Sequence, residues 1–192
     1  LENANLRGQE ELANLVPGLQ SAGIMSSEMP LHVLRGIGTL DYMGNNQTPV
    51  AVHLDGFYRG MNALMAGQFF DIERVEVLKG PQGTLYGRNT VGGVVSVVTR
   101  DAPDTLSGSI AVETGSSAVS GDDFWSIDAA IGGPIADNGS TAGLVFSHRK
   151  RDGYQPYQGF SAAGGSEDAL AIRGKLYFPI TDQLNLRLTA DY

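Results

Sequence analysis

The pattern of hydrophobic and polar residues changes about halfway along the chain of 192 residues. From residue 106 onward, apolar and polar side chains alternate through one segment after another, which is the period-two pattern of half-buried strands. Before that point, helix-like and strand-like signals are mixed. We therefore predict two structural units, residues 1–105 and residues 106–192. The second unit is predicted to hold five strands: Ser109–Thr114, Phe124–Gly132, Thr141–Arg149, Ala169–Phe178 and Leu184–Tyr192.

The first unit is predicted to be a small, glycine-rich α+β domain. Leucines within residues 6–15 indicate a short helix, which Pro17-Gly18 should end. Strands are predicted at Met29–Leu34 and on both sides of an Asp55-Gly56 turn. Residues Asn62–Phe69 have the composition of one or two helical turns.

The segment Glu73–Arg100 contains two further predicted strands joined by a glycine-rich turn. Val75 and Val77 alternate with charged residues, whereas Val94–Val98 is nearly all valine and should be buried on both faces. Glycines here and earlier in the chain are expected to serve tight turns and close backbone packing. These glycines are Gly36, Gly80, Gly83, Gly87, Gly92 and Gly93.

A phosphate-binding loop is the competing interpretation of this turn. Gly83 and Gly87 stand one residue too close together for a P-loop, and Arg88 and Asn89 occupy the places of its Lys and Ser/Thr. A strand follows, so no helix N-terminus would point at an anion. We do not predict a nucleotide site.

Composition excludes further classes of function. A formal charge of −8 opposes binding to nucleic acid, because nothing offsets the repulsion from phosphates. The chain has no cysteine and therefore no disulfide or thiolate metal site. Its histidines, His32, His53 and His148, lack the spacing of a metal-binding pair. Neither a metal nor a cofactor is predicted, and no run of about 18 apolar residues indicates a transmembrane helix.

The connections between the strands of the second unit differ in length. The second and fourth are compact turns, whereas the third, residues 150–168, is much longer. Short turns at one end and long loops at the other are typical of outer-membrane β-barrels, although a soluble sandwich also gives alternating strands. In a barrel, Trp125, Phe178 and Tyr192 would lie near an aromatic girdle.

A barrel also predicts which side chains face lipid and which face the lumen. The side chains expected to face lipid are Trp125, Ile127, Leu170, Ile172, Leu186 and Leu188. The side chains expected to face the lumen are Ser126, Asp128, Arg173 and Arg187.

Four blocks between about Leu12 and Arg100 resemble, in order and spacing, the plug domain of TonB-dependent outer-membrane receptors. They are "LANLVPGLQ", "LRGIG", "VAVHLDGFYRG" and "IERVEVLKGPQGTLYGRNTVGGVVSVVT". The resemblance implies an α+β plug domain followed by antiparallel strands of a transmembrane β-barrel, here partial. It also implies that the protein is not an enzyme, has no catalytic residues, and lies in the outer membrane of a Gram-negative bacterium.

The resemblance assigns roles to individual residues. Arg35 and Lys79 stand where such receptors carry cations that pair with barrel carboxylates and lock the plug. Glu76 is the matching acidic position of the same strand as Lys79 and is expected to be the third residue of this lock. Such receptors more often have Arg in place of Lys79, and Lys lacks the fork for a two-bond contact. The carboxylate partners would follow Tyr192, so both cations should be exposed or use local partners such as Glu76. The ligand-facing loops would be residues 39–47 and 58–65, with the polar candidates Tyr42, Asn45, Arg59 and Asn62.

The implied function is active uptake of a scarce ligand, most often a ferric siderophore, with cobalamin, haem, other chelates and oligosaccharides as further cargoes of such receptors. The expected partners are TonB, a small ligand and outer-membrane lipid, and not nucleic acid. The chain is expected to be a fragment: a signal peptide and the TonB-binding segment would precede Leu1, and most of the barrel would follow Tyr192.

Two other functional classes stay open on the sequence. A passive porin-like channel explains the alternating strands but not the plug-like first unit. A secreted β-rich carbohydrate-binding module or glycosidase would need paired carboxylates, for which Asp122-Asp123 or Asp55 with Glu73 are the candidates.

Overall fold

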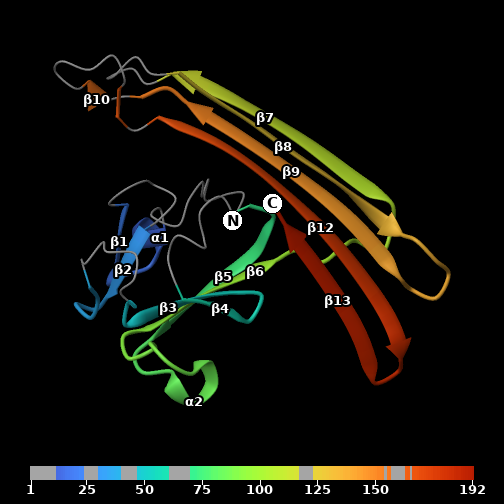
Figure 1. The fold of residues 1–192 in the computed structure, drawn as a ribbon, viewed down its shortest axis with the longest axis horizontal. Helices are drawn as coiled ribbons and strands as arrows, with labels where there is room; N and C mark the ends of the chain where they lie inside the picture. Colours follow the sequence, from blue (N-terminus) through green and yellow to red (C-terminus); the bar gives the residue numbers. More distant parts are fainter. Residues whose placement is uncertain are drawn as a thin grey trace. The chain divides into compact units, whose positions relative to one another are not determined.

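The computed structural model describes residues 12–23, 30–39, 47–60, 70–116, 123–153, 155–156, 163–164 and 166–192. The chain forms two compact units, Leu1–Arg100 and Asp101–Tyr192 (Figure 1). This division and the sequence-based boundary at residue 105 both precede the strand that begins at Ser107. Within the described ranges, no helix is long and apolar enough to cross a membrane.

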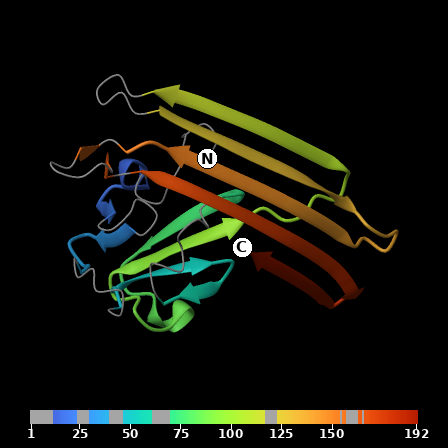
Figure 2. The same ribbon diagram turned by 45° about the horizontal axis from the view of Figure 1, so that its top comes forward.

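The described part of the first unit is mixed α+β, with two short helices and two sheets (Figure 2). Strands β1 and β2 form an antiparallel pair. The larger sheet has the strand order β4-β3-β6-β5, in which β3 and β6 are parallel and the other neighbours antiparallel. The elements are α1 (Leu12–Leu15), β1 (Leu19–Gly23), β2 (Pro30–Leu34), β3 (Val50–Leu54), β4 (Phe57–Arg59), β5 (Ile72–Lys79), α2 (Gly83–Tyr86) and β6 (Gly93–Thr99).

The core of this unit is aliphatic and centres on β3 and β6. Val94, Val95 and Val97 are fully buried, which confirms that β6 is covered on both faces. Central strands that are covered on both faces read as continuous apolar runs because each side chain faces other apolar groups. Residues of α1, β1 and β2 complete the core, which comprises Leu12, Leu19, Leu34, Val50, Val52, Leu54, Val95 and Val97.

Most predicted elements of the first unit are present, and two were missed. Pro17-Gly18 follows the end of α1, and the Asp55-Gly56 turn joins β3 to β4, as expected. The strand β1 was not predicted, because its sequence LQSAG has weak β-propensity and its strand conformation comes from pairing with β2. Helix α2 was read as turn, since its four residues are too few for a periodic signal. The predicted turns at Asn62–Phe69 lie outside the described residues.

The glycines singled out in the sequence differ in what the backbone requires of them. Gly36, Gly80, Gly87 and Gly93 have positive φ, and a Cβ on Gly92 would crowd Ile37 and Val50. Gly83, which begins α2, has neither restriction, since the nearest atom to an added Cβ is Thr90 Oγ1 at 3.9 Å.

Replacing Gly93 with Ala should destabilise the plug unit, whereas Gly83→Ala should be tolerated. At Gly93 φ is +148°, and an added Cβ would overlap the Leu78 carbonyl oxygen and lie 2.5 Å from Leu34 Cδ2. We expect a loss of about 1–3 kcal/mol from overpacking and, at Gly83, a change within about 1 kcal/mol. Hydrogen exchange of β5 and β6 in the full-length protein measures both. Equal protection in the two variants would contradict this account.

The described part of the second unit is dominated by one antiparallel sheet of strand order β13-β12-β9-β8-β7 (Figure 1). All five predicted strands are confirmed, and their bounds shift by a few residues. They are β7 (Ser107–Ser116), β8 (Asp123–Pro134), β9 (Thr141–Arg151), β12 (Glu167–Thr181) and β13 (Leu184–Asp191). The long connection between β9 and β12 also holds a short pair, β10 (Gln155–Pro156) and β11 (Ala163–Gly164), which was not predicted.

The register of this sheet separates its side chains into an apolar and a polar face. Ile127 lies opposite Val112 and His148, whereas its neighbour Ser126 lies opposite Glu113 and Arg149. The predicted lipid-facing and lumen-facing sets therefore lie on opposite faces of the sheet. Which face meets lipid stays a prediction.

Candidate functional site

Both predicted lock cations lie at the Pro17-Gly18 turn. Lys79 Nζ donates a hydrogen bond to the Pro17 carbonyl oxygen at 2.8 Å. The Arg35 backbone N–H donates to the Gly18 carbonyl oxygen at 2.7 Å, and the Arg35 side chain is exposed. Residues 44 positions apart are thus held at one turn, because Arg35 follows β2 and Lys79 ends β5.

The turn that carries Arg35 has a left-handed backbone. Arg35 and Gly36 have φ of 52° and 79°, and Leu34 and Ile37 exchange backbone hydrogen bonds of 2.9 and 3.0 Å across them. Positive φ at both central positions is the geometry of a type I′ hairpin turn. A non-glycine residue in this conformation is uncommon, so the guanidinium is presented at some cost in backbone energy.

Arg35 is exposed and Lys79 has a local partner in Pro17, which are the two outcomes expected of these cations, whereas Glu76 pairs elsewhere. It accepts a hydrogen bond from Arg74 Nε at 2.8 Å, and Glu73 pairs with Arg74 Nη1 at 2.9 Å. The hydrogen bond that Arg74 donates to Glu76, and to a lesser extent its interactions with Glu73, raise the pKa of Arg74. Alternation along β5 explains why Glu76 does not pair with Lys79, since the two side chains extend from opposite faces of the strand.

One of the four predicted ligand-facing residues lies in the described part of the chain. Arg59 ends β4 opposite Val52, and its buried Nε has no hydrogen-bond partner among the described residues. A buried donor without a hydrogen-bond partner lowers the stability of the folded state, so Arg59 Nε is a candidate to bind an acceptor from outside the described residues. Tyr42, Asn45 and Asn62 lie outside the described residues.

A polar and aromatic cluster between α2 and the β3–β4 hairpin was missed by the sequence analysis. Asn89 Nδ2 donates to Tyr58 Oη at 2.7 Å and also to Gln47 Oε1. The Arg88 guanidinium lies 5.3 Å from the centre of the Tyr58 ring. The buried His53 ring packs between Tyr58 and Tyr86, with centroid separations of 5.6 and 5.1 Å. The one sequence feature that could have indicated this cluster is Asn89, which we compared only with the Ser/Thr of a P-loop.

His32 lies buried in β2, where its Nδ1 is 2.7 Å from Ser21 Oγ on β1. Burial lowers the pKa of His32 from 6.5 to about 4. The folded plug therefore holds a neutral imidazole at pH values where the unfolded chain would bind a proton.

Acidification from pH 6.5 to 4 should destabilise the β1–β2 pair. Below pH 6.5 His32 binds a proton in the unfolded state, whereas in the folded state it stays neutral until about pH 4. The free energy of unfolding therefore decreases as the pH is lowered from 6.5 to 4. The full effect is about 3 kcal/mol, at 1.36 kcal/mol per unit of pKa difference. Hydrogen exchange of β1 and β2 in the full-length protein at several pH values measures it. The non-titrating variant His32→Asn should lose this slope, and a slope that persists in it would assign the effect elsewhere.

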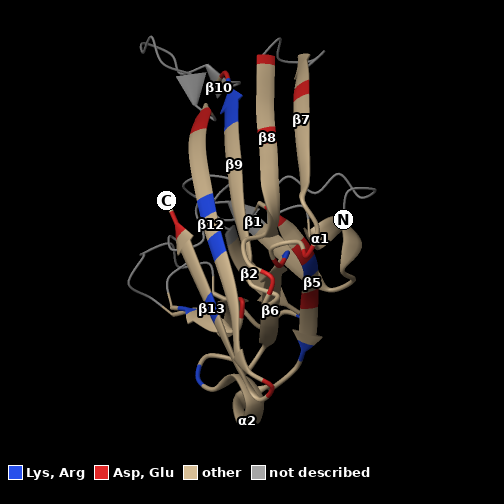
Figure 3. Ribbon diagram, turned by 90° about the vertical axis from the view of Figure 1, so that its right-hand side faces the viewer, with Lys and Arg blue, Asp and Glu red and all other residues tan. Residues whose placement is uncertain are grey.

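Figure 3 marks the charged residues along the strands of the second unit, and the register places Arg173, Lys175, Arg187 and Asp191 together on the polar face. Arg173 is fully buried, and its Nε donates to Asp191 at 2.6 Å. Arg187, in contrast, is exposed and pairs with Asp101 at 3.1 Å. A buried guanidinium with a short charge-assisted hydrogen bond is a fixed feature of this face, whereas the exposed pair adds little.

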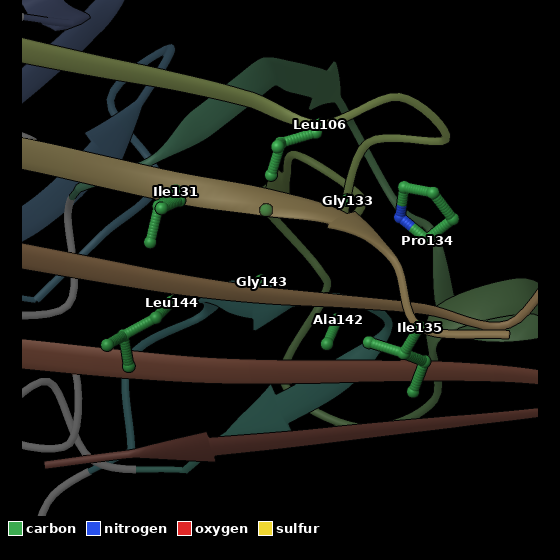
Figure 4. A pocket seen from close by; sticks show the side chains of 9 residues that line it. Leu106, Ile131, Gly133, Pro134, Ile135, Ala142, Gly143 and Leu144 are labelled. Atoms are coloured by element: carbon green, nitrogen blue, oxygen red, sulfur yellow. The ribbon is translucent and has the colours of Figure 1, made fainter.

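The apolar face carries a shallow groove and a polar border. Gly133 and Ala142, opposite each other on β8 and β9, leave a depression of about 310 Å³ (Figure 4). The larger side chains around it are Leu106, Ile131, Ile135 and Leu144. Nearer the long connection, the Trp125 ring lies 4.8 Å from that of His148, whose Nε2 is 2.9 Å from Asp168 Oδ1.

The structure gives little support to a glycosidase. The Asp55 carboxylate accepts hydrogen bonds from Thr99 N at 2.8 Å and Thr99 Oγ1 at 2.9 Å, and Glu73 pairs with Arg74. Both carboxylates are thus engaged within the fold, and Asp122 lies outside the described residues. Within the described ranges, no three His, Asp or Glu residues gather in a way that could hold a metal ion.

Comparison with known proteins identifies the class to which the chain belongs. The TonB-dependent receptor plug domain family matches residues 1–94. The chain belongs to this family: it holds a plug domain, followed by antiparallel strands that match those of solved TonB-dependent receptors. An outer-membrane location and the expectation that the protein is not an enzyme follow from this membership.

Individual relatives extend the match over the whole chain. The pesticin receptor of Yersinia pestis is 27% identical over 192 residues, which is 100% of this chain and 26% of that receptor. The ferrioxamine B receptor of Salmonella typhimurium is 27% identical over 188 residues, covering 94% and 24%. The crystal structure of the ferric yersiniabactin uptake receptor FyuA from Yersinia pestis superposes with a TM-score of 0.74 at 26% identity, covering 100% and 29%. The chain thus spans about a quarter of the length of these curated relatives.

Proposed function

We propose that the full-length protein is an outer-membrane receptor that takes up a ferric siderophore or similar iron chelate, with energy delivered through TonB. The observation that carries this proposal is the plug unit itself, which precedes a sheet with one apolar and one polar face. A passive porin needs no such unit, and a soluble carbohydrate-binding module needs neither the plug nor an apolar outer face.

Relatives of the chain narrow the class of ligand. Two of the relatives are named for ferrioxamine B and ferric yersiniabactin, both iron complexes. We propose a small iron chelate as cargo and place Arg59, with Tyr42, Asn45 and Asn62, among the residues that face it.

The lock between plug and barrel is the second part of the proposal. Arg35 and Lys79 lie at one turn, so a single acidic surface on the barrel wall can engage both. Lys79 already donates one hydrogen bond to Pro17, which leaves it two further N–H donors. We propose that the carboxylates pairing with these cations lie beyond Tyr192, and that Glu76, which pairs with Arg74, is not their partner.

The proposed function is tested by uptake of radioactive iron into cells that express the full-length protein as their sole iron receptor. The chelates are ferric yersiniabactin, ferrioxamine B and ferric citrate, each supplied with and without an agent that dissipates the proton gradient. We expect accumulation of at least one chelate, abolished by the agent. Accumulation that survives loss of the gradient would indicate a passive channel, and accumulation of none would reject an iron-chelate receptor for these ligands.

A further inference from the structure

Asn89 contacts the ends of both segments that we place toward the ligand. Gln47 is the last residue of the segment 39–47, and Tyr58 is the first residue of the segment 58–65. A single atom, Asn89 Nδ2, donates to the side-chain oxygens of both. An amide nitrogen carries two hydrogens, so these two bonds use its full donor capacity.

The backbone conformation of Asn89 suits its place in the bridge, by which we mean its two hydrogen bonds to Gln47 and Tyr58. Its φ of 63° lies in the left-handed region, which asparagine tolerates better than other residues with a side chain. The side chain is half-buried, and the neighbouring Arg88 and Tyr86 add ring contacts to Tyr58 and His53. Segments that lie eleven positions apart in sequence, at Gln47 and Tyr58, are thereby fastened to one loop.

That loop, residues 80–92, is closed at its base and leads directly to the lock cations. Gly80 N donates to Gly92 O and Gln82 N to Thr90 O, each at 3.0 Å. Lys79 immediately precedes the loop. At its other end, Gly92 N donates to Pro49 O at 2.9 Å, and a Cβ on Gly92 would lie 3.0 Å from Ile37, in the turn of Arg35. Because this loop is short and closed by hydrogen bonds, we expect a displacement of Asn89 to move the loop as a whole.

We infer that Asn89 is a positioning residue that couples Gln47 and Tyr58, at the ends of the two proposed ligand-facing segments, to each other and to the loop 80–92, beside Arg35 and Lys79. This inference rests on the proposed function for the meaning of the coupling, but the bridge itself is a property of the ligand-free protein. A movement of Gln47 or Tyr58 on ligand binding would change the hydrogen bonds of Asn89, and the loop would carry that change to the lock. Contiguity alone does not establish coupling, so the test measures it directly.

The first arm of the test needs no ligand. Hydrogen exchange of the full-length protein is compared between the wild type, Asn89→Gly and Arg88→Ala. Glycine accepts the left-handed backbone, so Asn89→Gly removes only the side chain. We expect exchange in residues 47–52 and in residues 57–60 to rise together, by roughly fivefold for one lost hydrogen bond in each. Arg88→Ala, the matched control, removes only the contact with Tyr58 and should affect residues 57–60 alone.

The second arm asks whether the bridge carries a signal, with ferric yersiniabactin as the probe. At saturating probe, binding should alter exchange in residues 80–92 of the wild type, and in Asn89→Gly that response should be lost. Uptake at saturating probe should fall by about tenfold, while the total amount of bound probe stays the same. A variant that had only lost binding sites through misfolding would instead bind less probe.

Each outcome decides a different statement. If Asn89→Gly raises exchange in only one segment or in neither, the bridge is absent and the inference is overturned. If both segments respond but the probe still alters residues 80–92 in the variant, Asn89 holds the segments without transmitting, and the coupling to the loop is overturned. If the protein does not bind the probe, the proposed function fails for that chelate, while the ligand-free arm still decides the bridge.

Discussion

Removing the Arg35 side chain from the full-length receptor should loosen the plug without unfolding the barrel. Arg35 is exposed at the surface of the plug unit and has its backbone fixed by the Gly18 carbonyl and a type I′ turn. Breaking a buried or partly buried pair leaves its partner unpaired, which typically costs about 3 kcal/mol or more. At 1.4 kcal/mol per tenfold, the population of loosened plugs should rise on the order of a hundredfold.

The measurement is entry of a large antibiotic that the closed receptor excludes, together with gradient-dependent uptake of iron chelate. Arg35→Ala and Arg35→Gly should both leak, because they share the lost guanidinium; leakage with Ala alone would trace the effect to the strain that Ala suffers at a φ of 52°. Lys79→Ala should leak less, since Lys79 cannot form a two-bond contact and also bonds Pro17. Normal uptake and no leakage in all three variants would show that neither cation holds the plug.

An arginine at Ile127 should disturb assembly of the barrel far more than an arginine at the adjacent Ser126. Ile127 shares a face with Val112 and Ile131, whereas Ser126 lies among Glu113 and Arg149 on the polar face. A charge on the lipid face costs about 2–4 kcal/mol at the bilayer midplane and less toward the boundaries, whereas one in a hydrated lumen costs little. The two substitutions add the same side chain one residue apart, so they control for size and charge.

Assembly can be followed by the heat-dependent migration of the full-length protein on an unboiled gel and by its resistance to urea after insertion into lipid vesicles. We expect a lower midpoint of unfolding for Ile127→Arg and a near-normal midpoint for Ser126→Arg. A larger loss for Ser126→Arg would mean that the polar face meets lipid, and equal losses would mean that the sheet belongs to a soluble sandwich.

The periodic part of the fold could be read from the sequence because its side chains obey a local rule. Strands β8, β12 and β13 repeat an apolar residue at most second positions, and this alternation predicted the strands of the sheet and its two faces. The valines of β6 likewise predicted a strand covered on both faces. The four sequence blocks predicted the plug domain, which the family match over residues 1–94 confirmed.

Only the tertiary structure decided which distant residues meet. Nothing local places Lys79 beside Pro17, or Asn89 between Gln47 and Tyr58, because these contacts depend on how β3, β5 and β6 are ordered in the sheet. The same holds for β1, whose sequence has weak β-propensity and which forms a strand by pairing with β2. Periodicity records how each residue sits within its own element, whereas contacts across the fold follow from strand order and register, which no single element encodes.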